Sequence, residues 1–128
     1  MKQAARVLVV NDSLKWLESI REVLQRAGFD VIGLTNGHDA LAECEAGKPA
    51  AIVLDYHLGN GVTAADFIRK FEKLCPGVPI GIVSATDVTL DPKQLGVRFF
   101  VPLDTPAPGE APHWESDLTA RVRECTTC

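Results

Sequence analysis

The chain has 128 residues, 46% of them hydrophobic and 23% charged, and a formal net charge of −4. This size and balance are typical of one globular domain that can bury a core, so we expect a single domain over residues 1–128. The charged residues form no basic patch or like-charged run, which argues against nucleic acid or an anionic membrane as a partner. No segment has the pattern of a signal peptide or a membrane span, and a cytoplasmic protein is expected. Its four cysteines, including the terminal pair Cys125 and Cys128, should then be reduced thiols.

Short apolar runs alternate with amphipathic segments in the first half of the chain. Residues 6–10 form an apolar run that ends in polar residues, and apolar residues then recur at helical spacing as far as residue 27. Residues 29–34 are β-rich, and a second helical pattern stops before Pro49. The next apolar run, residues 50–54, ends at Asp55 and is followed by glycines. We therefore predict three strands separated by two helices, the third strand carrying Asp55 into a loop.

The second half continues the alternation with one exception. Residues 63–74 open with a capping-box spacing and form an amphipathic pattern, and residues 79–84 and 97–101 read as the fourth and fifth strands. Only 12 residues, 85–96, connect those strands, so the fourth helix must be short. A proline-rich loop and a last helix from residue 114 follow. The pattern predicts an α/β fold, a five-stranded doubly wound parallel sheet of flavodoxin-like type with a shortened fourth helix.

Polar side chains follow three of the predicted strands at the points where the strands end. Asn11 and Asp12 follow the first strand, Asp55 ends the third, and Ser84 ends the fourth. In open α/β sheets the carboxyl ends of the strands are where ligands bind. If these strands are neighbours, two carboxylates and a hydroxyl meet at one edge. Oxygen ligands of this kind suit Mg²⁺.

The segment Val53-Leu54-Asp55-Tyr56-His57-Leu58-Gly59-Asn60-Gly61 resembles the phosphoacceptor segment of receivers attached to hybrid histidine kinases. Over residues 6–125 the chain is similar to the response-regulator receiver domains of two-component phosphorelay signalling. The resemblance implies that Asp55 accepts a phosphoryl group from a phosphohistidine. It also implies that Asp12, Asp55 and the main-chain carbonyl of His57 hold Mg²⁺, and that the hydroxyl of Ser84 bonds the phosphoryl group.

Several positions depart from the receiver pattern. Asn11 stands where the family usually has a further acidic residue, and Val101 stands where a lysine usually precedes the proline after the fifth strand. Loss of one such charge typically costs about a hundredfold in rate, so slow phosphotransfer is expected. The short fourth helix implies a different output surface. The switch aromatic is ambiguous, because its slot holds Arg98 or, if the lysine is a deletion, Phe99.

These observations together predict an atypical, stand-alone receiver that is a phosphoprotein and not an enzyme. Its expected partners are a histidine kinase or phosphotransfer protein and a downstream protein. One alternative is a phosphorylation-independent pseudo-receiver that acts as a protein-interaction module. A more distant alternative is a small phosphohydrolase, which would need a general acid near Asp55 that the sequence does not place.

Overall fold

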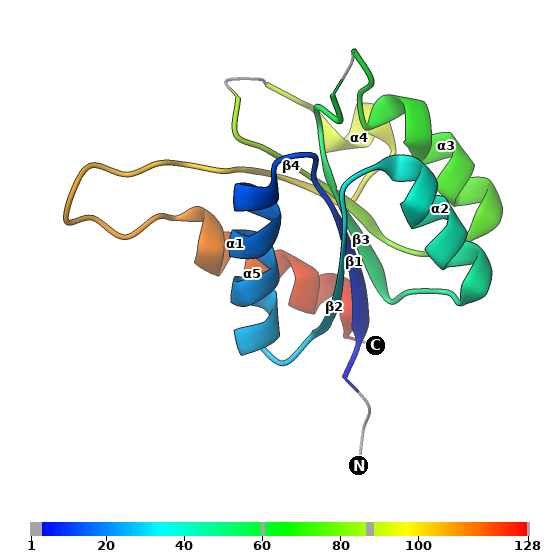
Figure 1. Cartoon of the computed structure of the whole chain (residues 1–128), viewed down its shortest axis with the longest axis horizontal. Coiled ribbons are helices and arrows are strands. Elements are labelled where there is room, and N and C mark those ends of the chain that lie inside the picture. The colour runs from blue at the N-terminus through cyan, green and yellow to red at the C-terminus, as the bar shows by residue number, and fades with distance from the viewer. Residues whose placement is uncertain (1–3, 60, 87–88, 128) are drawn as a thin grey trace.

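The protein forms one parallel five-stranded sheet covered by helices on both faces (Figure 1). The structure is a computed structural model that describes residues 4–59, 61–86 and 89–127. The strand order is β2-β1-β3-β4-β5, and every neighbouring pair is parallel. This confirms the predicted fold class. In chain order the elements are β1 (Arg6–Val10), α1 (Leu14–Arg26), β2 (Asp30–Leu34), α2 (Gly37–Ala46), β3 (Ala51–Asp55), α3 (Ala65–Leu74), β4 (Ile80–Ser84), α4 (Pro92–Leu95), β5 (Phe99–Pro102) and α5 (Trp114–Thr126).

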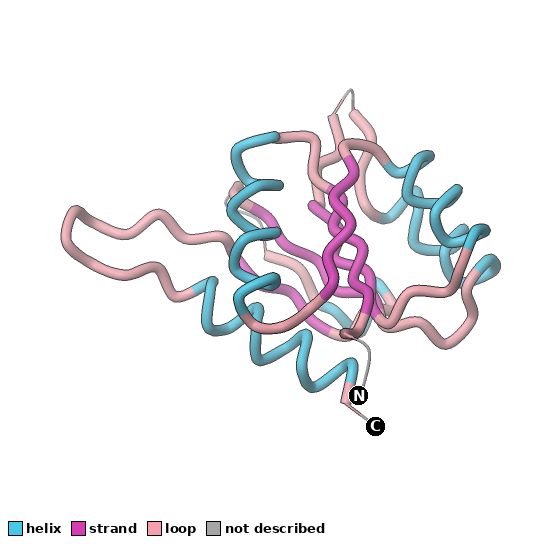
Figure 2. The backbone as a smooth tube through the Cα atoms, turned by 60° about the horizontal axis from the view of Figure 1, so that its bottom comes forward, coloured by secondary structure: helices cyan, strands magenta, loops and turns pink. Residues whose placement is uncertain are grey.

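The central strands are apolar throughout because both of their faces are covered. Alternate residues of β1, for example Val9 and Leu8, belong to two separate buried clusters, one on each side of the sheet. Helices α1 and α5 supply the first cluster, and α2 and α3 supply the second (Figure 2). None of the described helices is long and apolar enough to cross a membrane.

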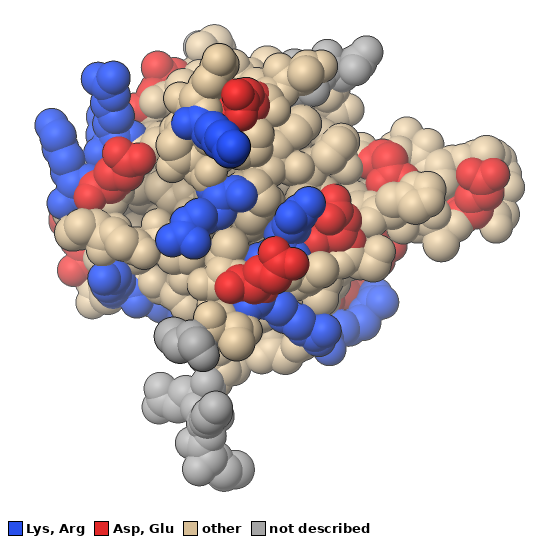
Figure 3. All heavy atoms as spheres, turned by 180° about the vertical axis from the view of Figure 1, so that it is seen from behind, with Lys and Arg blue, Asp and Glu red and all other residues tan. Residues whose placement is uncertain are grey.

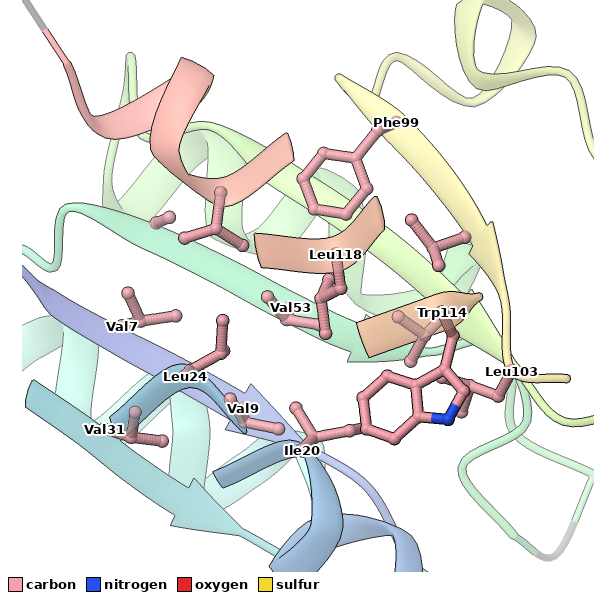
Figure 4. Close-up of a cluster of buried hydrophobic side chains, with 14 of the residues drawn as sticks. Val7, Val9, Ile20, Leu24, Val31, Val53, Phe99, Leu103, Trp114 and Leu118 are labelled. Atoms are coloured by element: carbon pink, nitrogen blue, oxygen red, sulfur yellow. The ribbon is translucent and has the colours of Figure 1, made fainter. Parts of the chain in front are cut away.

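The cluster beneath α1 and α5 includes two aromatic side chains, Phe99 and Trp114 (Figure 4). Each contacts another segment of the chain. Phe99 of β5 lies over Gly81 of β4, where a Cβ atom would come within 2.0 Å of the ring. Trp114 is 5% exposed and meets the half-buried Trp16 edge to face at 5.7 Å between ring centroids. The apolar contacts of β5 and α5 therefore join the C-terminal part of the chain to the sheet.

The short fourth helix is confirmed, and its two ends explain its length. Asp91 caps its first turn by accepting the N–H of Lys93, and Pro92 is compatible only with that first turn. Gly96 then takes a left-handed conformation with φ of +74°, which ends the helix. Only a single turn fits between these two signals.

A loop over residues 103–113 projects from the body of the molecule (Figures 1 and 2). Its base is closed by Asp104, whose carboxylate accepts the backbone N–H groups of His113 and Trp114 at 2.9 and 2.8 Å. These hydrogen bonds lower the pKa of Asp104 and satisfy N–H groups at the start of α5.

Some boundaries and details differ from the sequence predictions. β2 begins at residue 30 and β5 covers residues 99–102, because pairing with β1 and β4 sets where each strand begins and ends. Half of the expected capping box forms at α3: Asp66 accepts the N–H of Thr63 at 2.9 Å, but the helix cap itself is Ala64, which has no side-chain bond. Cys125 is a free thiol, and Cys128 lies outside the described residues.

The surface carries charges of both signs. On the face seen in Figure 3, Lys and Arg side chains alternate with Asp and Glu and gather into no extended basic area. Several of the arginines pair with acids one helical turn away, as Arg121 does with Asp117 at 3.4 Å. Such pairs neutralise charge locally, so this face offers no surface that suits a polyanion.

Candidate functional site

The strand register brings the predicted site residues to one edge of the sheet. Val10 of β1 lies opposite Leu54 of β3, so Asn11 and Asp12 leave β1 beside Asp55. On its other side β3 pairs with β4, where Asp55 lies opposite Val83, one residue before Ser84. The carboxyl ends of β1, β3 and β4 therefore meet at one rim.

Asp12 and Asp55 interact closely at this rim. Burial first, and then the charge and hydrogen bonding of Asp12, raise the pKa of Asp55 to about 7. Backbone N–H groups of Tyr56 and His57 act in the opposite direction. The interactions that dominate this shift, among the described residues, include no Lys or Arg. Two acids thus share a site in which no positive charge is among the main influences on the pKa of Asp55.

The loop after β3 folds back onto the loop after β1. Gly59 has a φ of +85°, and a Cβ atom built on it would lie 3.1 Å from Oδ2 of Asp12. A side chain at this position would be strained and would also crowd the carboxylate. Glycine is therefore required for the backbone to lie against Asp12. Asn60, the next residue of the segment, is outside the described residues.

The backbone at His57 belongs to this rim, and its carbonyl is the third candidate metal ligand. His57 forms an isolated antiparallel bridge with Thr63, and the flanking bonds are Leu58 N–H to Val62 O at 2.9 Å and Ala64 N–H to Tyr56 O at 2.8 Å. Those bonds make His57 and Thr63 a non-hydrogen-bonded pair, in which both backbone groups point away from the partner strand. The N–H of His57 acts on Asp55, so the backbone at His57 runs beside this carboxylate.

Asn11 is a buried amide with one free end. Its side chain is 1% exposed, and Oδ1 accepts the N–H of Ser13 at 2.9 Å. Within the described part of the chain, its Nδ2 has no hydrogen-bond partner. A buried donor without an acceptor is costly, so this end of β1 would gain from an anionic oxygen or a bound water.

The donor set fits a hard divalent cation such as Mg²⁺. Two carboxylates and a main-chain carbonyl provide oxygen ligands, which Mg²⁺ supplements with water. The described residues contain no group of three or more His, Cys, Asp and Glu side chains that would hold a metal.

Ser84 is buried at 1% exposure and bonds locally rather than to Asp55. Its Oγ lies 2.8 Å from Oγ1 of Thr86 and accepts the N–H of Thr86 at 3.2 Å. Sequence analysis did not identify Thr86 or the free amide of Asn11 as part of the site. The Ser-x-Thr spacing is a signal for this turn, because Ser and Thr hydroxyls commonly bond the backbone two residues on.

Two of the positions compared with the receiver pattern, Val101 and Phe99, lie in the core. Val101 is fully buried beneath α5, so this position offers no ammonium to the rim. Phe99 is buried in the same cluster and lies opposite Gly81, three residues before Ser84 along β4. Arg98 is exposed and precedes β5.

Comparison with known proteins agrees with this geometry. Residues 7–98 match the family defined as the response regulator receiver domain. The transcriptional regulatory protein PhoP for alkaline phosphatase synthesis of Bacillus subtilis is 35% identical over 96 residues, which are 73% of this chain and 38% of that protein. The chain thus spans well under half the length of the curated relatives it matches, down to 28% for a protein-glutamate methylesterase of Pseudomonas aeruginosa.

Solved structures share the fold. A receiver domain protein from Methanospirillum hungatei superposes with a TM-score of 0.76 at 21% identity, covering 94% of this chain and 92% of that one. A response regulator from Burkholderia pseudomallei, solved with a phosphorylated aspartic acid, a calcium ion and citrate, has a TM-score of 0.73 at 23% identity and covers 95% of this chain and 69% of that one. The chain therefore belongs to the response regulator receiver domain family of two-component signalling, whose members are non-catalytic phosphoacceptors.

Proposed function

We propose that Asp55 is the phosphoacceptor of this receiver and that Asp12, Asp55 and the carbonyl of His57 hold Mg²⁺. The observation that carries the proposal is the meeting of Asp12 and Asp55 at the carboxyl rim, where burial and then the neighbouring Asp12 raise the pKa of Asp55 to about 7. The phosphorylated aspartic acid of the Burkholderia pseudomallei structure is a precedent for this chemistry on the same fold.

The transfer step is a displacement at phosphorus. A carboxylate oxygen of Asp55 forms a bond to phosphorus while the bond from phosphorus to the donor's imidazole nitrogen breaks. The electron pair of that bond stays on the imidazole, which takes up a proton from water. Mg²⁺, when bound, supplies positive charge that offsets the carboxylates and the phosphoryl oxygens. The Nδ2 of Asn11, which has no partner among the described residues, and the hydroxyl of Ser84 add neutral side-chain donors to the backbone N–H groups of Tyr56 and His57.

The proposed receiver is atypical in how its charge is balanced. Three carboxylates and one ammonium, the set that the resemblance implies for a typical receiver, sum to −2. Here Asn11 and Val101 are both neutral, and Asp12 and Asp55 again give −2. Attraction for a divalent cation is preserved, whereas the phosphoryl group loses a positively charged partner. We therefore expect Mg²⁺ binding to be retained and phosphotransfer to be slow.

The proposed partners follow from this chemistry. A histidine kinase or phosphotransfer protein supplies the phosphohistidine, and a downstream protein reads the phosphorylated state. Because α4 is reduced to residues 92–95, its surface is small. The output surface is therefore expected to include elements other than α4.

Incubation with acetyl phosphate and Mg²⁺, followed by intact-mass measurement, tests the phosphoacceptor. We expect a gain of one phosphoryl group that requires Mg²⁺ and is lost in Asp55→Asn. The matched control is Asp30→Asn, which changes an exposed acid at the opposite end of the sheet and should leave labelling unchanged.

Two outcomes favour the alternatives. No gain in mass across metal and pH conditions, with the fold intact by circular dichroism, favours a phosphorylation-independent interaction module. Sustained release of phosphate from a generic phosphate ester, lost in Asp55→Asn, favours a phosphohydrolase. The described site offers two carboxylates, a hydroxyl and an amide but no general acid aimed at a leaving group, so sustained ester hydrolysis is not expected.

A further inference from the structure

The hydroxyl of Ser84 is already occupied in this structure. It accepts the backbone N–H of Thr86 at 3.2 Å and shares a second hydrogen bond, 2.8 Å long, with the hydroxyl of the same threonine. A serine hydroxyl has one proton and two acceptor lone pairs. Its Oγ also lies 3.5 Å from the carbonyl oxygen of Thr86, so all of its hydrogen-bond partners among the described residues belong to this one threonine. Ser84 is 1% exposed, and water has little access to replace either bond.

The backbone at Ser84 is held independently of its side chain. Its carbonyl accepts the N–H of Leu103 at 2.8 Å, and Tyr56 bonds the carbonyl of the preceding Val83 at 2.9 Å. These bonds tie the end of β4 to both of its neighbours. A change at Ser84 is therefore expected to be a rotation of the side chain, which breaks the bonds to Thr86, rather than a movement of the strand.

Thr86 differs from Ser84 in its surroundings. It is exposed, whereas Ser84 is buried, so a released threonine hydroxyl can bond water at once. Releasing the pair costs Ser84 its partners, whereas Thr86 loses Ser84 Oγ as the acceptor of its backbone N–H but keeps a hydroxyl that water can reach. The hydroxyl–hydroxyl bond thus mainly fixes the orientation of the Ser84 side chain and contributes little to the stability of the fold.

We propose that Thr86 is a positioning residue that holds the Ser84 hydroxyl away from Asp55 until a phosphoryl group competes for it. This inference rests on the proposed role of Asp55. The bond to Thr86 is lost when Ser84 turns toward a phosphoryl oxygen, so Thr86 weakens phosphoryl binding at the rim. The same exchange releases the turn at residues 84–86, which begins the connection to α4.

The test uses beryllofluoride with Mg²⁺ as a stable mimic of the phosphoryl group, with binding followed by NMR of the whole chain. Thr86→Val removes the hydroxyl but keeps the shape and the backbone N–H. We expect its apparent Kd for beryllofluoride to fall about fivefold, the equivalent of one ordinary hydrogen bond. Thr86→Ser keeps the hydroxyl and should retain the wild-type Kd.

A second pair of proteins separates this role from a general effect on the fold. In a Ser84→Ala background, the further change Thr86→Val should leave the Kd unchanged, because the hydroxyl it acts on is gone. An unchanged or higher Kd in Thr86→Val, or the same fall in the Ser84→Ala background, overturns the inference alone. Wild-type protein that binds neither beryllofluoride nor a phosphoryl group at Asp55 overturns the proposed function and this inference with it.

Discussion

At the carboxyl ends of β1 and β3, two acids lie together in a partly buried site, whereas residues 99–127 are held mainly by apolar contacts. The family match ends at residue 98, just before this second region begins. Val101 links the two regions. It stands at the position where a lysine of the rim was expected, but its side chain packs in the core beneath α5. The unfavourable proximity of the two acids and the apolar packing that stabilises the fold are therefore found in different parts of the molecule. The rim carries the proposed chemistry, and the apolar clusters stabilise the fold around it.

The strongest test of the packing side is Phe99→Ala. Phe99 is 5% exposed and lies directly over Gly81, so its loss leaves a cavity that the sheet cannot close. We expect the free energy of unfolding to fall by about 3–5 kcal/mol, measured by urea denaturation. Phe100→Ala, on the other face of β5 and only half-buried, should cost clearly less. Equal losses would show that Phe99 has no special part in joining the C-terminal region to the sheet.

Val101→Lys tests whether a charge can be returned from the packed region to the rim. The long side chain must run from a buried position toward Asp55, with its apolar stem in the core and its ammonium at the rim. If the ammonium reaches the rim, labelling by acetyl phosphate should accelerate by up to about a hundredfold.

Val101→Met is the matched control for this substitution, because it adds length without charge. It should leave the labelling rate near that of the wild type. If labelling were faster in both variants, the cause would be repacking of β5 and not the restored charge.

Asp55→Asn tests how much the ionised Asp55 destabilises the fold. EDTA is present so that no divalent cation offsets its charge. Folding raises the pKa of Asp55 from 3.8 to about 7, so the native state favours the protonated acid. The protonated carboxyl of Asp55 makes its full contribution to the stability of the fold below about pH 4, and this contribution is lost as the pH rises through 7. Relative to the wild type, the variant should therefore gain stability between about pH 5 and pH 8.5.

We expect this gain to be about 1 kcal/mol, because the full shift is reduced by solvent screening at a partly exposed site. Urea denaturation at both pH values measures it. Asp30→Asn should show no such gain, since Asp30 is exposed and far from the rim. A gain of the same size at both pH values would mean that the effect does not come from the titration of Asp55.

Much of the fold was accessible from local patterns. The apolar runs that became β1 and β3 end at the predicted polar residues, since a strand covered on both faces cannot continue through a carboxylate. The single turn of α4 followed from its connection length and from Pro92 and Gly96. The contact of Asp12 with Asp55 was expected from the convergence of parallel strand ends.

Other features depended on residues that meet only after folding. The fit of Phe99 over Gly81 joins β5 to β4, and the contact of Trp16 with Trp114 joins α1 to α5. No periodicity in one segment reports which distant side chain will face it. The bond between Ser84 and Thr86 was local but was overlooked, because the hydroxyl was interpreted only as a partner for a phosphoryl group.

The amino-acid sequence by itself determined which segments become strands and which oxygen-bearing side chains stand at the ends of β1, β3 and β4, because these depend on nearby residues and on the alternation of apolar runs with polar turns. The tertiary structure alone decided that Val101 lies in the core and that the buried Nδ2 of Asn11 finds no partner among the residues that the structure describes. It also decided how strongly the two acids interact. The burial of a side chain and the interaction between two charged groups depend on atoms from several strands, so neither is defined until the sheet has formed.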